Sequence, residues 1–348
     1  MGDRVRDAAR GLTRLRTAHC APRVGHGYHL LAARSAHRGP VMAGRAQPQP
    51  MPGAGFIDPK VLARIGNLEL IAKTVVEGFL NGLHRSPHLG ASMDFAEHRA
   101  YNPGDDIRRI DWKLFARSDR YHIKEFEADT NTNFLVLLDV SASMRYAGPG
   151  SIPKIDYARY LAASLSYFSH HQRDRVGMVT FDRDVIEYVP PSAKHLNVVL
   201  HTLDRMKPGD KGELEAPLRK IAESVRRRSI LVLISDLYHE PEQVLRAISH
   251  LKGKGNDILV FHILDKAELE FPFDEASQFE DIESGERLPV IPQYLRVQYK
   301  ALIEQHINTL SQLLGRNRID YSLFDTSRPL DEALFTYLSN RQRMMRVR

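Results

Sequence analysis

The chain has 348 residues, of which 43% are hydrophobic and 26% charged, as is ordinary for a folded globular protein with one full-sized domain and an additional module. Its formal net charge of +6 would suggest a nucleic-acid partner, but nine arginines within residues 1–50 account for it, and the rest of the chain is near neutral. Apolar runs such as ILVLI at 230–234 are too short to cross a bilayer, so we expect neither nucleic-acid binding nor a membrane span.

Residues 1–55 form a basic extension that ends in a Pro- and Gly-rich linker, and we expect it to be disordered. If so, Met42 or Met51 is the expected working start; a transit-like or partner-binding arm is the alternative reading. The only cysteine, Cys20, lies in this extension, which leaves no disulfide framework or thiolate metal site for the fold to depend on. This cysteine usage predicts a cytoplasmic protein.

Residues 56–130 are expected to form a separate unit ahead of the main domain. Apolar residues recur at helical spacing from Val61 to Leu83, which predicts one amphipathic helix. A strong turn signal at NPGDD (102–106) and short alternating stretches such as RYHIKEF then predict a small β-rich module.

Residues 131–348 alternate between buried strands and amphipathic helices. The expected strands are 134–140, 176–181, 185–189, 229–236 and 257–264, and the expected helices include 155–171, 193–206 and 213–227. An irregular excursion at 270–292 with an SG turn precedes a last helix, strand and helix. Helices between continuous apolar strands predict an α/β fold with a doubly wound, mainly parallel sheet.

Oxygen-bearing side chains cluster at two predicted strand ends. The stretch FLVLLDVSASM (134–144) ends its apolar run on Asp139 and continues with Ser141 and Ser143, and LVLISDL places Asp236 at the end of a later strand. Ligands of open α/β sheets bind beyond the carboxyl ends of the strands, where these residues are expected to meet. Carboxylates and hydroxyls suit a hard cation, so the four residues are predicted to hold Mg²⁺ or Mn²⁺.

The pattern Asp-x-Ser-x-Ser with a later strand-end Asp resembles the metal-ion-dependent adhesion site of von Willebrand factor A domains. The longer block RSPHLGASMDFAEHRAYNPGDDIRRIDWKLFAR, together with GMVTF, RRRSILVLISDL and PLDEALFTYLSNR, resembles the domain-of-unknown-function-58 family over about residues 60–345. The resemblance implies a von Willebrand factor A-like domain that binds a protein partner through the cation. It also implies a MoxR-type AAA+ ATPase as that partner, in a chaperone-like or maturation complex.

The chain departs from this pattern before the helix at 213–227. Relatives tend to have a Thr ligand there, whereas this sequence has KGELE, with Gly212 at the Thr position. Glu213 or Asp210 are the possible substitute ligands. A second surface, the basic block that includes Arg108, Arg109, Trp112 and Arg117, is read either as a partner-binding face or as ion pairs that tie the two units together.

These features favour a non-enzymatic, metal-dependent interaction module. GxSxG, GxxxxGK[ST], HExxH and GxGxxG motifs do not occur in the sequence. Two alternatives stay open: an interaction protein whose site works without metal, and a Mg-dependent phosphoryl-transfer hydrolase with Asp139 as nucleophile. The hydrolase is disfavoured because Ser141 stands where a second acid would serve proton transfer.

Overall fold

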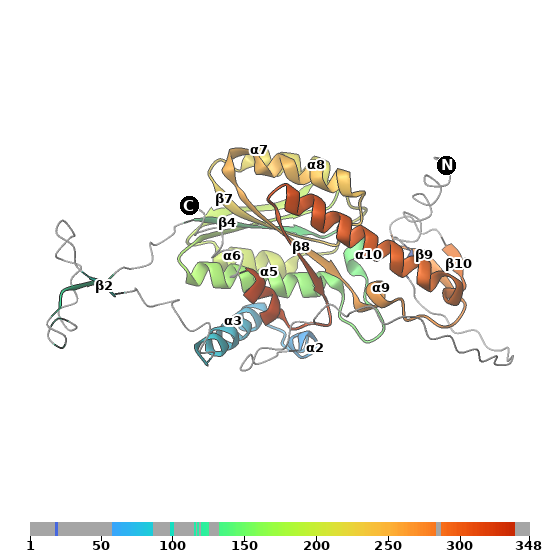
Figure 1. Ribbon diagram of the computed structural model, residues 1–348, viewed down its shortest axis with the longest axis horizontal. Helices are drawn as coiled ribbons and strands as arrows, with labels where there is room; N and C mark the ends of the chain where they lie inside the picture. The colour runs from blue at the N-terminus through green and yellow to red at the C-terminus, as the bar shows by residue number, and fades with distance from the viewer. Residues whose placement is uncertain are drawn as a thin grey trace.

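A six-stranded sheet forms the centre of the computed structural model, which describes residues 18–19, 58–85, 98–100, 115, 117, 120–124, 132–282 and 287–337 (Figure 1). The strand order is β11-β8-β7-β4-β5-β6, and only β6 runs antiparallel to its neighbour. The bounds are β4 (Asn133–Asp139), β5 (Arg175–Phe181), β6 (Val185–Ser192), β7 (Ser229–Ser235), β8 (Asp257–Leu264) and β11 (Asp320–Asp325). The doubly wound, mainly parallel sheet expected from the sequence is confirmed.

The central strand β4 is apolar throughout because both of its faces are buried. Phe134, Val136 and Leu138 belong to the core on one side of the sheet, and Leu135 and Leu137 to the core on the other. Alternate side chains of a strand point to opposite faces, so a strand that is covered on both sides needs a continuous apolar run.

Helices cover both faces of the sheet (Figure 1). One side carries α5 (Lys154–His171), α6 (Leu196–Arg205) and the helical segment at 330–337, and the other carries α7 (Glu215–Ser224), α8 (Pro241–Lys252) and α10 (Pro292–Arg316). Short 3₁₀ turns, η2 (Ala142–Arg145) and η3 (Gly253–Gly255), follow β4 and α8. Helices therefore cover both faces of the sheet. A functional site is expected at the carboxyl ends of the parallel strands, called the carboxyl edge below.

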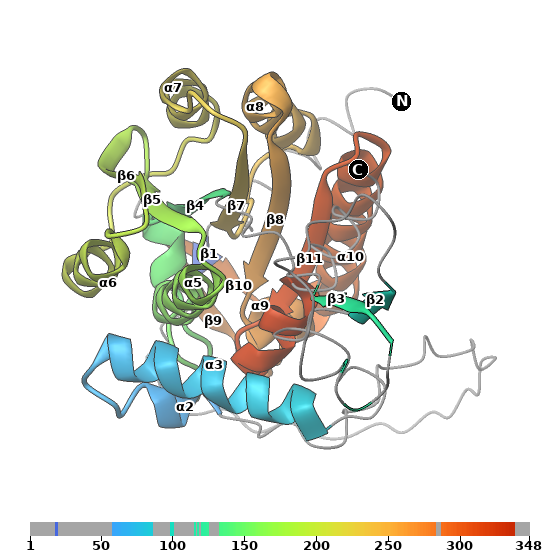
Figure 2. The same cartoon turned by 90° about the vertical axis from the view of Figure 1, so that its left-hand side faces the viewer.

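The amphipathic segment before the sheet domain is two helices, so the prediction of a single helix was wrong. They are α2 (Pro59–Leu62) and α3 (Leu68–Arg85), and Asn67 separates them because its side-chain oxygen accepts a hydrogen bond from Leu70 N at 3.0 Å, as a helix cap does. α3 packs on the outer side of α5, where the rings of Phe79 and Phe168 meet edge to face (Figure 2).

Smaller elements complete the described chain. The two-stranded sheet of β2 (His98–Ala100) and β3 (His122–Lys124) lies within the expected β-rich module, most of which falls outside the described residues. The excursion after β8 contains α9 (Lys266–Glu270), β9 (Ser277–Asp281) and β10 (Arg287–Val290), and β9 also pairs with β1 (Ala18–His19) from the basic extension. Within the described residues, no helix combines the length and apolar character needed to span a bilayer.

Candidate functional site

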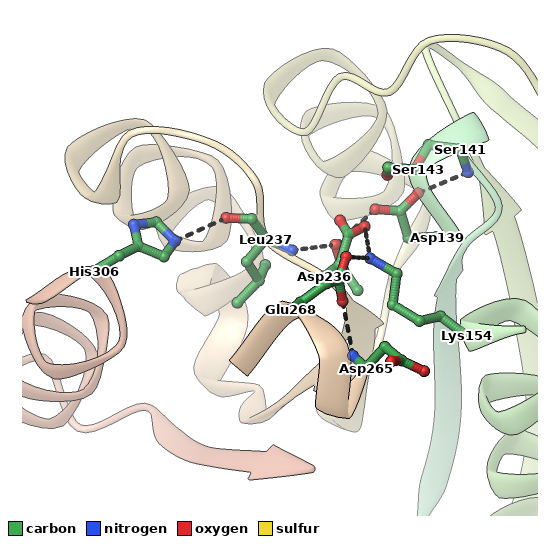
Figure 3. Close-up of polar contacts among 10 residues, drawn as sticks. Asp139, Ser141, Ser143, Lys154, Asp236, Leu237, Asp265, Glu268 and His306 are labelled. Atoms are coloured by element: carbon green, nitrogen blue, oxygen red, sulfur yellow. Dashed lines mark hydrogen bonds and ion pairs between the residues drawn. The ribbon is translucent and has the colours of Figure 1, made fainter. Parts of the chain in front are cut away.

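Four predicted site residues lie together at the carboxyl edge of the sheet (Figure 3). Asp139 is the last residue of β4, Ser141 is the N-cap residue of η2, and Ser143 lies within η2. Asp236 follows β7 directly, and β7 is the hydrogen-bonded neighbour of β4, with Leu138 opposite Ile234. The parallel register therefore brings the two carboxylates to one point, as the sequence predicted.

The carboxylate of Asp139 is buried and held from both sides. Its Oδ1 accepts a hydrogen bond from Ser141 N at 2.9 Å, and its Oδ2 accepts one from the Ser235 hydroxyl at 2.6 Å. Burial, together with the nearby carboxylate of Asp236, raises the pKa of Asp139 from 3.8 to about 6, although the hydrogen bonds from Ser235 and Ser141 oppose that rise. A buried carboxylate in this state is stabilised by any cation that reaches it.

Two hydroxyls stand beside the carboxylates. The Oγ atoms of Ser141 and Ser143 are 3.1 Å apart, and both side chains are buried. The hydroxyls add neutral oxygen ligands to the two carboxylates, so the donor set contains only oxygen, which suits Mg²⁺ or Mn²⁺.

A buried lysine that the sequence analysis did not single out supplies positive charge to this site. Lys154, the first residue of α5, is 0% exposed, and its Nζ lies 2.9 Å from Asp236 Oδ2 and 2.8 Å from Glu268 Oε1. Burial disfavours the ammonium, but the carboxylates of Asp236 and Glu268 outweigh that effect and raise the pKa of Lys154. The ring of Tyr238 lies 4.7 Å from Nζ, where a cation–π contact adds to the ion pairs.

The backbone around these side chains is fixed by further hydrogen bonds. Glu268 Oε2 accepts a bond from Asp265 N at 2.7 Å, in the capping box that begins α9. Leu237, which follows Asp236, is buried and has a positive φ of 48°, a conformation that costs about 1–3 kcal/mol in a residue other than glycine. The carbonyl of Leu237 lies 3.3 Å from His306 Nε2 of α10 (Figure 3). The exit from β7 is thus held in one conformation, which directs Asp236 toward Lys154.

The loop before α7 is tied to the same turn. Ala142 N donates to the carbonyl of Asp210 at 2.7 Å, and Gly209 N donates to the carbonyl of Val140 at 2.6 Å. This places the backbone of the loop that contains Gly212 beside the site, but the side chains of Asp210 and Glu213 are exposed. Over the described part of the chain, no three His, Cys, Asp or Glu side chains converge as a metal cluster, so neither substitute joins Asp139 and Asp236 in such a set.

The basic block lies mainly outside the described residues. Of its four candidate residues, Arg108, Arg109 and Trp112 fall outside them, and Arg117 is exposed. Its role as a partner-binding face stays a prediction.

Fold and site together define a doubly wound α/β domain with a buried, oxygen-rich cluster at the carboxyl edge of its sheet. The chain belongs to the protein family of unknown function DUF58, whose profile matches residues 97–309. It is 29% identical over 233 residues to the uncharacterized proteins Mb1516 of Mycobacterium bovis and Rv1480 of Mycobacterium tuberculosis, covering 66% of this chain and 73% of theirs.

Among solved structures, the chain is similar to the conserved hypothetical protein BatB from Bacteroides thetaiotaomicron, with a TM-score of 0.42 and 16% identity over 61% of this chain and 99% of that one. It is also similar to an aerotolerance-related membrane protein from Bacteroides fragilis, with a TM-score of 0.38 and 19% identity over 58% of this chain and 96% of that one.

Proposed function

We propose that the cluster at the carboxyl edge binds a divalent cation, Mg²⁺ or Mn²⁺, and through it a protein partner, in the manner of a von Willebrand factor A-like adhesion site. One observation carries the proposal: the cluster holds three buried carboxylates, those of Asp139, Asp236 and Glu268, but only one buried ammonium, that of Lys154, which pairs with Asp236 and Glu268 and not with Asp139. With all four groups ionised, the cluster keeps two negative charges, which a divalent cation would balance.

The residues present fit such an ion. Asp139, Ser141 and Ser143 would hold it, because their side-chain oxygens gather on one turn. Asp236 would contribute mainly its charge, since its Oδ2 already pairs with Lys154. A bound Mg²⁺ or Mn²⁺ supplies Lewis acidity and an open coordination position that accepts a carboxylate.

The partner we propose is a protein that offers a carboxylate, and the family resemblance suggests a MoxR-type AAA+ ATPase in a chaperone-like or maturation complex. Complementary charge would then favour association and make it dependent on the metal. A catalytic role is disfavoured, because both oxygens of Asp139 already accept hydrogen bonds and the residue is only 4% exposed, which hinders attack on a phosphoryl group.

An interaction protein that works without metal is the second candidate. Two observations favour it: Lys154 already places a cation beside Asp236, and Gly212 offers no hydroxyl ligand. The two candidates differ in whether Asp139 requires a cation of its own.

The test is metal binding by the full chain, followed by thermal unfolding and calorimetry in Mg²⁺, Mn²⁺ or EDTA. A ligand that binds only the native state raises the unfolding midpoint. At a ligand concentration of about 100 times its Kd, the free energy of unfolding rises by about 2.7 kcal/mol. We expect Asp139→Asn to abolish the increase. Asp257→Asn, at the opposite end of β8 and paired with Arg228, is the matched control and should retain it. An equal midpoint with and without metal in the unmodified protein would favour the metal-free candidate.

A further inference from the structure

A second polar site lies at the opposite edge of the sheet from the carboxylate cluster. A cavity of about 680 Å³ opens beside the first residues of β4, β5 and β7, where Asn133, Arg175 and Ser229 begin their strands. Seven-residue strands separate it from Asp139 by roughly 20 Å. The cavity is therefore independent of the proposed metal site.

Three arginines from two parts of the chain line this cavity. Arg175 comes from β5, and Arg226 and Arg227 from the turn between α7 and β7. Among the described residues, none of the three makes an ion pair, whereas their neighbour Arg228 pairs with Asp257 at 3.2 Å. The arginines thus bring unused guanidinium donors to one cavity, and guanidinium groups match phosphate and carboxylate oxygens in pairs.

The net charge and the other side chains of the cavity indicate which class of ligand it would bind. Glu223 is the one acidic residue of the lining, so three arginines against it leave two positive charges, which match the charge of a phosphate monoester at neutral pH. Tyr188 is 42% exposed, and it lies close enough to Arg226 for that charge to affect its hydroxyl. An aromatic ring, a carboxylate and the Asn133 amide offer contacts to the organic part of such a ligand.

We propose that this cavity binds the phosphate monoester of a small organic molecule. Its volume lies within the range of small-molecule sites, about 300–1,000 Å³. The guanidinium groups of Arg175, Arg226 and Arg227 hold the phosphate, and Glu223 and Asn133 accept or donate hydrogen bonds to the hydroxyl or amino groups of the organic part. The domain then carries two separate sites, one at each edge of its sheet.

Calorimetric titration of the full chain tests the assignment with four probes: AMP, glycerol phosphate, inorganic phosphate and adenosine. EDTA is present throughout, so that the result does not depend on the proposed metal site. We expect at least one monoester to bind more tightly than inorganic phosphate, and adenosine to bind least. The double variant Arg226→Gln/Arg227→Gln should weaken monoester binding by at least about tenfold, because two charge-assisted contacts are lost. Both side chains are exposed, so the variant is expected to fold.

Arg228→Gln is the matched control, since it removes an arginine from the same turn whose guanidinium is engaged elsewhere. It should leave monoester affinity unchanged. The assignment is overturned if neither monoester binds at concentrations up to about 10 mM, if inorganic phosphate binds as well as both monoesters, or if the double variant binds as the unmodified chain does. Tighter binding of a hexaglutamate peptide than of either monoester would also overturn it, in favour of an acidic peptide ligand.

Discussion

Replacing Lys154 by Met removes the buried ammonium that pairs with both Asp236 and Glu268 in the carboxyl-edge cluster. Both acidic side chains are nearly inaccessible, at 3% and 4% exposure, so water cannot replace the lost charge. Breaking a buried ion pair in this way lowers the free energy of unfolding by about 3–5 kcal/mol. Urea unfolding of the full chain in EDTA measures the loss.

An exposed lysine of the same chain provides the control. Lys220 Nζ lies 2.6 Å from Asp184 Oδ2, but both side chains are more than half exposed. Lys220→Met should therefore lower stability far less than Lys154→Met does, because solvent screens an exposed pair. The ion-pair distances of Lys154 and Lys220 are similar, so a larger loss of stability in Lys154→Met would be due to the burial of its ion pairs.

Magnesium should affect the Lys154→Met variant more than the unmodified protein. Without the ammonium the cluster keeps one more negative charge, so a divalent cation at Asp139 is attracted more strongly. We expect Mg²⁺ to raise the unfolding free energy of the variant by a larger amount than that of the unmodified chain. A loss below about 1 kcal/mol in EDTA would refute the reasoning that Lys154 is a buried counter-ion. An equal effect of Mg²⁺ on both proteins would refute the placement of the cation beside it.

Three further predictions concern the surrounding residues. Burial and the nearby His306 lower the pKa of His262 from 6.5 to about 3, so the unfolded chain binds this proton at a higher pH than the folded chain, and the free energy of unfolding falls by about 1.4 kcal/mol per pH unit below pH 6.5. Urea unfolding of the His262→Asn variant from pH 7 to 4 should lack that contribution, and the same pH dependence in both proteins would contradict it. Gly212→Thr should raise the affinity for Mg²⁺ measured by calorimetry, because it adds a hydroxyl to the loop beside the site, whereas Lys211→Thr should not. Equal affinities of the two variants would contradict the assignment of position 212 as a ligand position. Asp265→Ala should lower the free energy of unfolding by about 1–3 kcal/mol, because Ala267 N and the Thr326 hydroxyl lose their hydrogen-bond acceptor. An unchanged free energy in thermal unfolding would show that the cap of α9 is dispensable.

The sheet was predictable because its strands are buried on both faces. A run such as FLVLL at 134–138 has few alternatives to a central strand, and the helices between such runs required parallel pairing. The break between α2 and α3 was missed, because apolar residues keep helical spacing from Val61 to Leu68 and obscure the capping residue Asn67. The helix α9 was missed as well, although the spacing of Asp265 and Glu268 is that of a capping box.

The candidate site was only partly predictable. Asp139 and Asp236 end adjacent strands, so their meeting follows from parallel pairing alone. Lys154 and Glu268 are 114 residues apart, and no local pattern links them. One signal was available: Lys154 begins a helix, where the dipole disfavours a cation, so a lysine at that position needs a nearby carboxylate to stabilise it.

The position of Lys154 also explains how one domain could combine a permanent cation with an exchangeable one. Its ammonium pairs with Asp236 and Glu268, on the side of the cluster away from Ser141 and Ser143, as Figure 3 shows. Asp139 makes no ion pair with a described residue and faces the two hydroxyls instead. The lysine therefore offsets one of the two negative charges that Asp236 and Glu268 carry. The remaining carboxylate and the hydroxyls are left at the turn after β4, where an ion and a partner would have to enter.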